Sequence, residues 1–364
     1  MKVLVFGMTE NPGGVESFLM NYYRCINKKK IQFDFLCNSY QPIAYEQEIH
    51  QLGGKTYHIS SRSKNFLKYR KEMKAFFELH KDEYQVIWVN VCSLANIDYL
   101  KMAKKYGIPR RIIHSHNSQN MDGILRKILH DLNKRKIGRF ATDFWACSQS
   151  AAEWFYGTGS AEIVHNAINC DQMFCDERKR IKYRRQLKWE DNYVIGNIGR
   201  FHFQKNQLFV LDVFYELQQK MPEARLVLIG QGEDEKKIRD KVHDLSLEGK
   251  VCMPGVQQDI SGWLSAMDIF LFPSVFEGLG IAALEAQANG IPVLASSTVP
   301  KEVKINNNVI FLNLDRPVKD WVQVLYKMKN EYPRIKSDEI KAAFIEKQYD
   351  IDTEVNKLEM LFME

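Results

Sequence analysis

Two glutamates, Glu277 and Glu285, lie eight residues apart in the apolar, glycine-rich stretch PSVFEGLGIAALEAQANGIPVLASS. The pattern predicts a strand, then a loop, then a helix that begins near Gly280. Because a helix rises about 1.5 Å per residue, an acid before this helix and an acid inside it stand too far apart to form a pair. Each carboxylate therefore needs its own partner, and the hydroxyl groups at the two ends of a nucleoside diphosphate sugar are suitable ones.

The residues between the two acids form a loop that suits a phosphate. Gly278 and Gly280 flank Leu279 and let the backbone approach a ligand, and the free N–H groups of a first helical turn attract anions. In the structural alternative, Glu277 is an acid at a helix N-terminus and Glu285 is a solvated helix residue. The alanines around Glu285 argue against that alternative because they indicate a buried helix face.

A basic loop comes at the end of the predicted strand 193–201. It places Arg200 and Lys205 in the sequence GRFHFQKN. A departing diphosphate needs fixed positive charge, which arginine supplies as a planar fork and lysine as a point charge. A solvated basic loop is the alternative interpretation.

Two histidines, His114 and His116, end another predicted strand in the sequence IIHSHN. Side chains alternate along a strand, so both rings are expected on one face. A metal site would need a third ligand, and none stands at a suitable spacing, so no metal is predicted. The sequence leaves open which histidine belongs to an active site and which is a packed residue behind it.

Apolar strand patterns alternate with amphipathic helix patterns along the whole chain. The predicted strands are 2–8, 31–38, 85–91, 110–116 and 143–148 in the first half, and 193–201, 224–232, 250–255, 268–274 and 291–297 in the second. This alternation predicts an α/β fold with two Rossmann-like, doubly wound parallel-sheet domains, which we place at 1–170 and 171–364.

Parallel sheets of this kind bind ligands at the carboxyl ends of their strands, so the two domains are expected to face an interdomain cleft. Neither half contains a G-x-G-x-x-G sequence, which argues against a nicotinamide dehydrogenase. The sequence leaves open whether the last helix, about 350–364, packs back on the N-terminal domain. Asp352 or Thr353 is predicted to cap that helix.

Charge is distributed unevenly along the 364 residues. The chain has a net charge of +6, but residues 1–170 alone hold 24 Lys and Arg against 15 Asp and Glu. Within them, residues 124–140 combine an apolar stripe with basic residues, which suits an anionic bilayer; a helix packed on a sheet is the equally weighted alternative. No aromatic-interleaved basic motif and no helix-turn-helix signal appears, so nucleic acid is not an expected partner.

The cysteines and the hydropathy indicate a location. The seven cysteines include no C-x-x-C pair, which is typical of a reducing compartment. No apolar run reaches the roughly 18 residues of a membrane span. We therefore expect a cytoplasmic protein, either free or peripheral at the inner face of the membrane.

Seven motifs in register resemble one family. The chain is similar to the retaining GT-B glycosyltransferases of family four, glycosyl transferases group 1, especially the bacterial exopolysaccharide and capsule type. The motifs are NPGGVE at 11–16, IIHSHN at 112–117, ACSQSAAEWF at 146–155, IVHNAIN at 163–169, IGRFHFQKN at 198–206, LIGQGE at 228–233, and the two glutamates with their flanking residues.

The resemblance implies roles for residues at matching positions. As catalytic residues it implies His116, Glu277, Arg200 and Lys205. As donor-binding residues it implies Gly14, Arg200, Lys205, Gly230, Gly232, Val256, Glu277, Gly278, Leu279, Gly280 and Glu285. On the acceptor side it implies Gly13, His114 and Asn117. No metal and no cofactor are implied, because the nucleotide-sugar donor, with uridine favoured by family frequency, is a substrate.

The resemblance also implies a reaction. The expected activity is retaining transfer of a sugar from a UDP-sugar to a saccharide, lipid-linked in many relatives, in polysaccharide biosynthesis. Two alternatives remain open: a nucleotide-sugar epimerase on the same architecture, and a non-catalytic partner subunit of a transferase. An epimerase would convert the donor without any acceptor.

Overall fold

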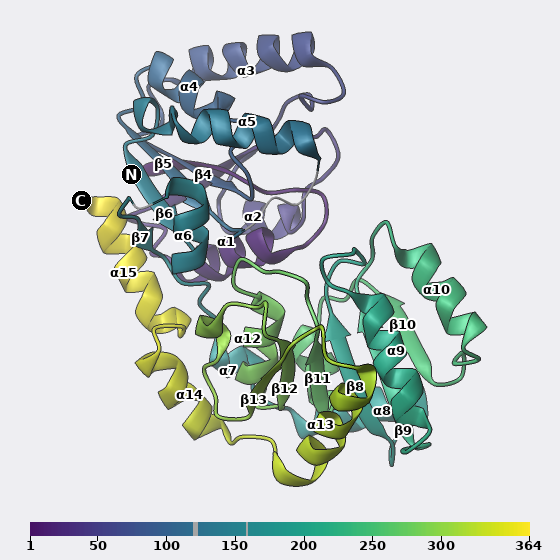
Figure 1. Cartoon of the computed structure of the whole chain (residues 1–364). Helices are drawn as coiled ribbons and strands as arrows, with labels where there is room; N and C mark the ends of the chain where they lie inside the picture. The colour runs from purple at the N-terminus through teal and green to yellow at the C-terminus, as the bar shows by residue number, and fades with distance from the viewer. Residues whose placement is uncertain (119–122, 158) are drawn as a thin grey trace. The chain divides into compact units, whose positions relative to one another are not determined.

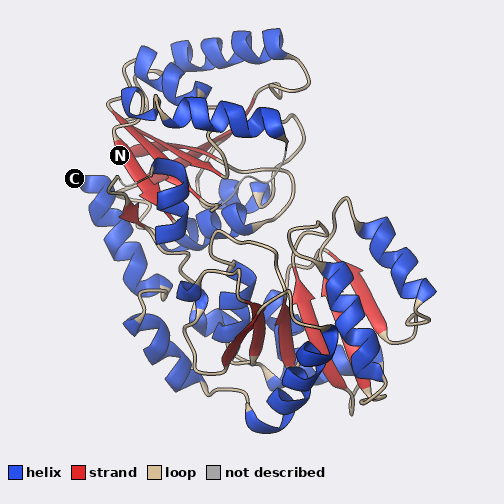
Figure 2. Ribbon diagram, in the orientation of Figure 1, coloured by secondary structure: helices blue, strands red, loops and turns tan. Residues whose placement is uncertain are grey.

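The chain folds into two compact α/β units, seen in a computed structural model that describes residues 1–118, 123–157 and 159–364. Unit 1 comprises Met1–Ala167 and Ile351–Glu364, and unit 2 comprises Ile168–Asp350. The first unit therefore ends three residues before the boundary expected at residue 170. Each unit is built around its own parallel sheet (Figures 1 and 2).

Unit 1 has a seven-stranded sheet in the order β3-β2-β1-β4-β5-β6-β7 within the described residues, and all of its pairings are parallel. Its elements are β1 (Lys2–Phe6), α1 (Gly14–Cys25), β2 (Gln32–Cys37), α2 (Glu46–Gln51), β3 (Thr56–His58), α3 (Phe66–His80), β4 (Val86–Val91), α4 (Asp98–Lys105), β5 (Arg110–Ser115), α5 (Ile124–Lys134), η1 (Ile137–Arg139), β6 (Asp143–Ala146), α6 (Gln149–Tyr156), β7 (Glu162–Ile163) and α15 (Ile351–Met363).

Both faces of the unit 1 sheet are covered by helices. Helices α3 and α4 pack on one face through a core that includes Tyr69 and Leu100 (Figure 1). On the other face, the Trp88 ring of β4 has its centroid 5.6 Å from that of Phe18 in α1 and 5.3 Å from that of Phe362 in α15. Burial on both faces explains why the strands are almost uninterrupted apolar runs.

Helix α15 belongs to unit 1, which settles what the sequence left open. The helix starts at Ile351, which is fully buried. Asp352 and Thr353 therefore lie inside the first turn, and the prediction that one of them caps the helix is wrong. Asp350 instead forms a bridge with Ile168 at the point where the chain leaves unit 2.

Unit 2 has a six-stranded parallel sheet in the order β10-β9-β8-β11-β12-β13 within the described residues. Its elements are α7 (Cys170–Met173), α8 (Glu177–Leu187), β8 (Tyr193–Ile198), α9 (Gln207–Gln218), β9 (Ala224–Ile229), α10 (Glu235–Asp244), β10 (Val251–Gly255), α11 (Ile260–Ala266), β11 (Ile269–Phe272), α12 (Ile281–Ala288), β12 (Val293–Ser296), η2 (Lys301–Val303), β13 (Val309–Leu312), α13 (Val318–Glu331) and α14 (Ser337–Glu346).

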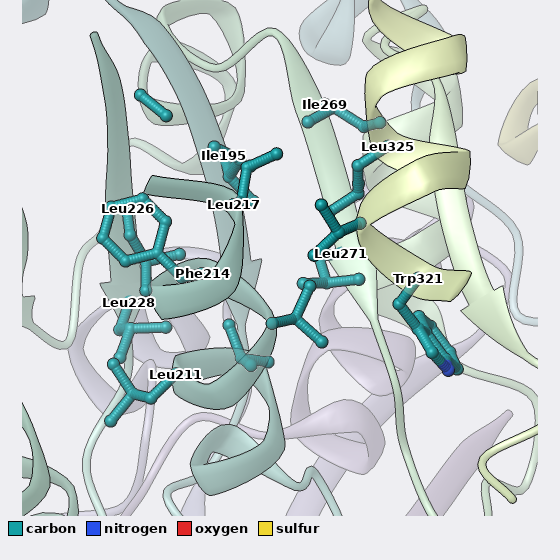
Figure 3. Packing of buried hydrophobic residues seen from close by; sticks show 14 of the residues in the cluster. Ile195, Leu211, Phe214, Leu217, Leu226, Leu228, Ile269, Leu271, Trp321 and Leu325 are labelled. Carbon is teal, nitrogen blue, oxygen red and sulfur yellow. The ribbon is translucent and has the colours of Figure 1, made fainter. Parts of the chain in front are cut away.

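The core of unit 2 lies between its sheet and two helices. Figure 3 shows Phe214 of α9 and Leu325 of α13 among the side chains of the central strands, which include Ile195 and Leu271. These buried aliphatic and aromatic groups hold β8 and β11 side by side and fix where their following loops begin. In the described residues no helix has the length and apolarity needed to cross a membrane.

Candidate functional site

Each sheet has one point where the strand order reverses. In unit 1 this point lies between β1 and β4, and in unit 2 it lies between β8 and β11. Loops that follow the two strands at such a point leave in opposite directions, so ligands of doubly wound sheets bind there. The loops of interest in unit 2 are residues 199–206, called here the Lys205 loop, and residues 273–280, called the Glu277 loop.

An ion pair joins these two loops. Lys205 Nζ donates to Glu277 Oε1 at 2.6 Å, and the two side chains are only 19% and 6% exposed. The Lys205 ammonium also lies 5.4 Å from the centroid of the Phe272 ring. A fixed positive charge and a buried carboxylate thus meet at the reversal point of unit 2, brought together across 72 residues of sequence.

Backbone and amide hydrogen bonds also tie the two loops together. Val275 N donates to the Gln204 carbonyl at 2.8 Å, and Gln204 Nε2 donates to the Phe276 carbonyl at 3.0 Å. Asn206 Nδ2 donates to the Pro273 carbonyl at 3.2 Å. Sequence reasoning missed these two amides. Their only signal was the presence of long polar side chains directly after a buried strand.

Glycine is required where the Glu277 loop enters helix α12. Gly280 has φ +103°, and a Cβ there would lie 3.0 Å from the Phe272 ring. Leu279 is buried, and Gly278 stands between it and Glu277. In the described residues, no side chain caps α12. The first-turn N–H groups of this helix therefore keep the arrangement that attracts an anion.

Glu285 lies one turn into α12, half-buried. Burial raises the pKa of this carboxyl to about 7, because the charged form loses solvation. In the described part of the chain it has no hydrogen-bond or ion-pair partner. Glu277 and Glu285 therefore have different environments, one paired with a lysine and one unpaired.

Arg200 lies at the exposed end of the Lys205 loop. Its guanidinium is 2.9 Å from Glu233 Oε2, and its side chain is 61% exposed. His202 Nε2 lies 3.2 Å from the other oxygen of the same glutamate. Partial burial raises the pKa of Glu233, but its hydrogen bonds and the charge of Arg200 outweigh this and leave the pKa below its ordinary value.

The two glycines of the LIGQGE motif have a structural reason to be glycine. Gly230 has φ +139°, and a Cβ there would overlap the Gly199 carbonyl oxygen. A Cβ on Gly232 would overlap the Phe201 carbonyl oxygen. These glycines let the loop after β9 pack against the Lys205 loop. Val256, after β10, is 40% exposed.

The histidine pair lies at the end of β5, which neighbours β4, one strand away from the reversal point of unit 1. His114 is fully buried, and in the described residues its ring nitrogens have no hydrogen-bond partner. His116 is half-buried, and its Nε2 lies 2.9 Å from Asn90 Oδ1 at the end of β4. The two ring centroids are 4.2 Å apart. Burial lowers the pKa of His116 to about 3 and holds the pKa of His114 well below its ordinary value.

The loop after β1 is organised by a buried acid that sequence reasoning missed. Glu16 accepts hydrogen bonds from Thr9 N at 3.0 Å and Thr9 Oγ1 at 2.6 Å, and burial raises its pKa. Gly13 precedes α1, and a Cβ there would lie 2.9 Å from Glu16 Oε2. Gly14 begins α1 and is exposed.

Asn117 is the remaining acceptor-side residue that the sequence indicated. It is buried directly after His116, and its Oδ1 accepts a hydrogen bond from Ser118 N at 3.0 Å. Residues 119–122, which follow in the sequence, lie outside the described residues. In the described part of the chain, no three His, Cys, Asp or Glu residues form a group that could hold a metal ion.

Two Rossmann-like parallel-sheet domains in one chain match the GT-B fold. Residues 179–317 match the family model described as Glycosyl transferases group 1. The chain is 28% identical to the putative glycosyltransferase EpsF of Bacillus subtilis (strain 168), over 96% of this chain and 92% of that protein. By these findings the chain is similar to group 1 glycosyltransferases over residues 179–317 and to EpsF over nearly its whole length.

Two further similarities are narrower. The UDP-Gal:alpha-D-GlcNAc-diphosphoundecaprenol alpha-1,3-galactosyltransferase of Escherichia coli is 31% identical over 110 residues, which are 29% of this chain and 28% of that protein. The crystal structure of Anabaena Alr3699/HepE in complex with UDP and glucose is similar in fold. The match covers 100% of this chain and 100% of that chain, with a TM-score of 0.82 and 18% sequence identity. At that identity the likeness concerns the fold alone.

Proposed function

We propose that this protein is a retaining glycosyltransferase of polysaccharide biosynthesis. It transfers a sugar from a nucleoside diphosphate sugar, most simply a UDP-sugar, to a saccharide acceptor. The observation that carries this proposal is the ion pair between Lys205 and Glu277 at the reversal point of unit 2, beside the open N-terminus of α12. A diphosphate needs such a cation and such N–H groups, and a sugar hydroxyl needs such a carboxylate.

Unit 2 binds the donor in this proposal. Lys205, Arg200 and the first turn of α12 hold the diphosphate, Glu277 accepts from a sugar hydroxyl, and Glu285 accepts from the ribose. Gly230, Gly232 and Val256 lie along the nucleotide, and Gly14 of unit 1 meets the donor phosphate or sugar. UDP is the nucleotide in the HepE complex, and a UDP-sugar is the donor named for the Escherichia coli relative.

Unit 1 binds the acceptor in this proposal. Gly13, His114 and Asn117 form the acceptor side, and His116, whose ring packs against His114, is the catalytic residue directed at the transferred sugar. The bond between the sugar C1 and the diphosphate oxygen breaks as a bond from C1 to the acceptor oxygen forms on the same face. The acceptor proton passes to the leaving diphosphate oxygen. Because Lys205 and Arg200 stabilise that leaving group, we propose that the reaction needs no metal.

An anionic membrane surface is the proposed location of the acceptor. Ile124 and Leu125 of α5 are 81% and 70% exposed, and Arg126 and Lys127 follow directly. An exposed apolar stripe with basic neighbours fits a bilayer that carries negative head groups. The Escherichia coli relative is named for an acceptor linked to diphosphoundecaprenol, which is a lipid.

Vesicle co-sedimentation tests this location. The I128E variant on α5 should lose binding to phosphatidylglycerol vesicles, and the wild type should bind phosphatidylcholine vesicles weakly. Ile345 of α14 gives a matched control, because Ile345 is 44% exposed and Ile128 is 49% exposed. Equal binding of the I128E and I345E variants would refute the α5 surface.

The activity itself is tested with purified protein, a panel of UDP-sugars and an undecaprenyl diphosphate-linked sugar, with EDTA present. We expect a glycosylated lipid whose new linkage keeps the anomeric configuration of the donor. Conversion of the UDP-sugar without acceptor would indicate the epimerase instead. UDP binding without turnover of any donor would indicate a non-catalytic partner subunit.

A further inference from the structure

Asn90 stands at the end of β4, directly beside the histidine pair, and sequence reasoning did not single it out. It is only 2% exposed. Its neighbour across the sheet is Gly7, where φ is +141° and a Cβ would lie 2.6 Å from the Asn90 carbonyl oxygen. Glycine at this position lets the end of β1 approach β4 closely, so the backbone around Asn90 is held tightly in place.

The amide of Asn90 can face only one way. Its Nδ2 lies 3.3 Å from the Trp88 carbonyl oxygen, and its Oδ1 lies 2.9 Å from His116 Nε2. The carbonyl of Trp88 can only accept a hydrogen bond, so the group facing it must be the NH₂ group. The opposite orientation would place two acceptor oxygens against each other. The oxygen of Asn90 therefore faces His116.

This orientation determines the proton on His116. An amide oxygen cannot donate, so His116 Nε2 must carry the hydrogen of the shared hydrogen bond. The titratable group that packs against this ring is His114, itself neutral and fully buried. Burial keeps His116 neutral as well. With one proton in total, placed on Nε2, the Nδ1 atom is left with a free lone pair.

We propose that Asn90 is a positioning residue that holds His116 as the neutral Nε2–H tautomer, so that Nδ1 accepts a hydrogen bond from a hydroxyl group of the bound saccharide. In this role His116 is not an acid. It orients a hydroxyl-bearing ligand by taking a hydrogen bond rather than giving one. The identity of the ligand rests on the proposed function, but the tautomer does not.

Nitrogen NMR of protein labelled with ¹⁵N-histidine tests the tautomer directly. The His116 signals are assigned by their loss in the H116A variant, and the two ring nitrogens are distinguished by their couplings to the carbon-bound ring protons. At pH 7 we expect a protonated Nε2 and an unprotonated Nδ1. A protonated Nδ1, alone or together with Nε2, would overturn the proposal.

Substitution of Asn90 by Asp separates positioning from mere packing, because the two side chains have nearly the same shape. A carboxylate still accepts from Nε2–H, but its negative charge stabilises the imidazolium and raises the pKa of His116. His116 is then protonated at low pH and regains its free Nδ1 as the pH rises. We expect kcat of N90D to be roughly ten-fold below wild type at pH 5 and to recover towards pH 8.

Two further variants complete the test. N90A should populate both tautomers and lower kcat at every pH, with UDP affinity unchanged. Asn96 is a half-buried asparagine of the same unit, whose Nδ2 donates to Tyr69 Oη at 3.0 Å, and N96D should keep the wild-type pH profile. A pH profile of N90D that matches the wild type would refute the positioning role.

The NMR measurement also keeps this inference distinguishable from the proposed function. If the wild type shows the Nε2–H tautomer but transfers no sugar, the proposed function fails and the assignment of the Asn90 hydrogen bond stands. If transfer is observed and the tautomer is the other one, the proposed function stands and the role of Asn90 is wrong. The wild-type spectrum decides the tautomer even if both Asn90 variants unfold.

Discussion

The reversal points of the two sheets have the same topology, but the side chains at one are charged and those at the other are neutral. In unit 2 an ammonium and a carboxylate, Lys205 and Glu277, form an ion pair. In unit 1 a neutral imidazole and an amide, His116 and Asn90, form a hydrogen bond without a formal charge. The sheet order determines where a ligand can bind, and the side chains after each strand determine which chemistry is available there.

The distribution of net charge alone would have predicted a diphosphate site in unit 1. The excess of basic residues lies in residues 1–170, yet the buried cation at a reversal point is in unit 2. Many basic residues of unit 1, including Lys71 and Lys74 of α3 and Arg126 and Lys127 of α5, are exposed, so water screens them. One lysine held in a buried site can matter more for a diphosphate than a broad excess of solvated charge.

The largest effect is expected when the cation at the reversal point of unit 2 is removed. K205A should lower the affinity for UDP by about 100- to 1000-fold, because the diphosphate loses its fixed charge. The variant also leaves Glu277 buried without its ion-pair partner, so its Tm should fall. Isothermal calorimetry and thermal unfolding measure both effects.

Lys241 gives a matched control for this variant. It lies on α10, pairs with Asp212 of α9 at 2.7 Å and is 27% exposed, and its Nζ also donates to the Leu208 carbonyl at 3.0 Å. K241A should bind UDP like the wild type. Equal UDP affinity of K205A and the wild type would show that the diphosphate binds elsewhere.

A second test concerns the packing that supports the Lys205 loop. In G230A the new methyl group meets the Gly199 carbonyl, and φ is +139°, so we expect a loss of stability of about 3 kcal/mol. Gly255 also has a positive φ, +75°, but nothing lies within 4 Å of its Cβ position, so G255A should cost only about 1 kcal/mol. Chemical denaturation measures the difference. Equal losses in both variants would mean that the packing argument is wrong.

A third test asks whether unit 1 contributes to turnover without contributing to nucleotide binding. H116A should lower kcat by roughly 100-fold, because an oriented hydrogen bond to the saccharide is lost. Its affinity for UDP should stay within about two-fold of the wild type, because the nucleotide is assigned to unit 2. H50A, at an exposed histidine, is the control. A large loss of UDP affinity in H116A would contradict the proposal that unit 2 alone binds the nucleotide.

The smallest expected effect concerns the pH dependence contributed by Glu285. Because burial raises its pKa to about 7, the carboxyl is mostly protonated at pH 6 and mostly charged at pH 8. The charged form accepts better from ribose hydroxyls, so UDP affinity should rise with pH by up to about 10-fold more in the wild type than in E285Q. Comparing the two proteins removes the contribution of the phosphate's own titration.

Raising the pH should have the opposite effect on stability: the wild type gains UDP affinity but loses stability relative to E285Q. A raised carboxyl pKa stabilises the native state fully below pH 4.5, and this contribution is lost as the pH rises through about 7. E285Q avoids the cost of a buried charge, so its Tm should exceed that of the wild type at pH 8 and match it more closely at pH 5. A Tm of E285Q below wild type at pH 8 would contradict the burial argument.

Part of the site could be located from sequence because its signals are local. Arg200, Lys205, Glu277 and Glu285 all stand in loops or helices that directly follow an apolar strand, so a reader of the sequence can place them at carboxyl strand ends. Their detailed partners were not accessible in the same way. Arg200 pairs with Glu233 rather than standing free, and Glu277 pairs with a lysine 72 residues away.

The sequence by itself determined the two parallel sheets, because strand and helix periodicities are properties of short segments and depend on burial alone. Only the tertiary structure decided that α15 packs in unit 1 and that Asn90 faces His116, 26 residues further along the chain. The physical reason is that a hydrogen bond or a packed ring depends on which strands become neighbours. Which strands become neighbours depends on the free energy of the whole folded unit, and no periodic sequence pattern reports it.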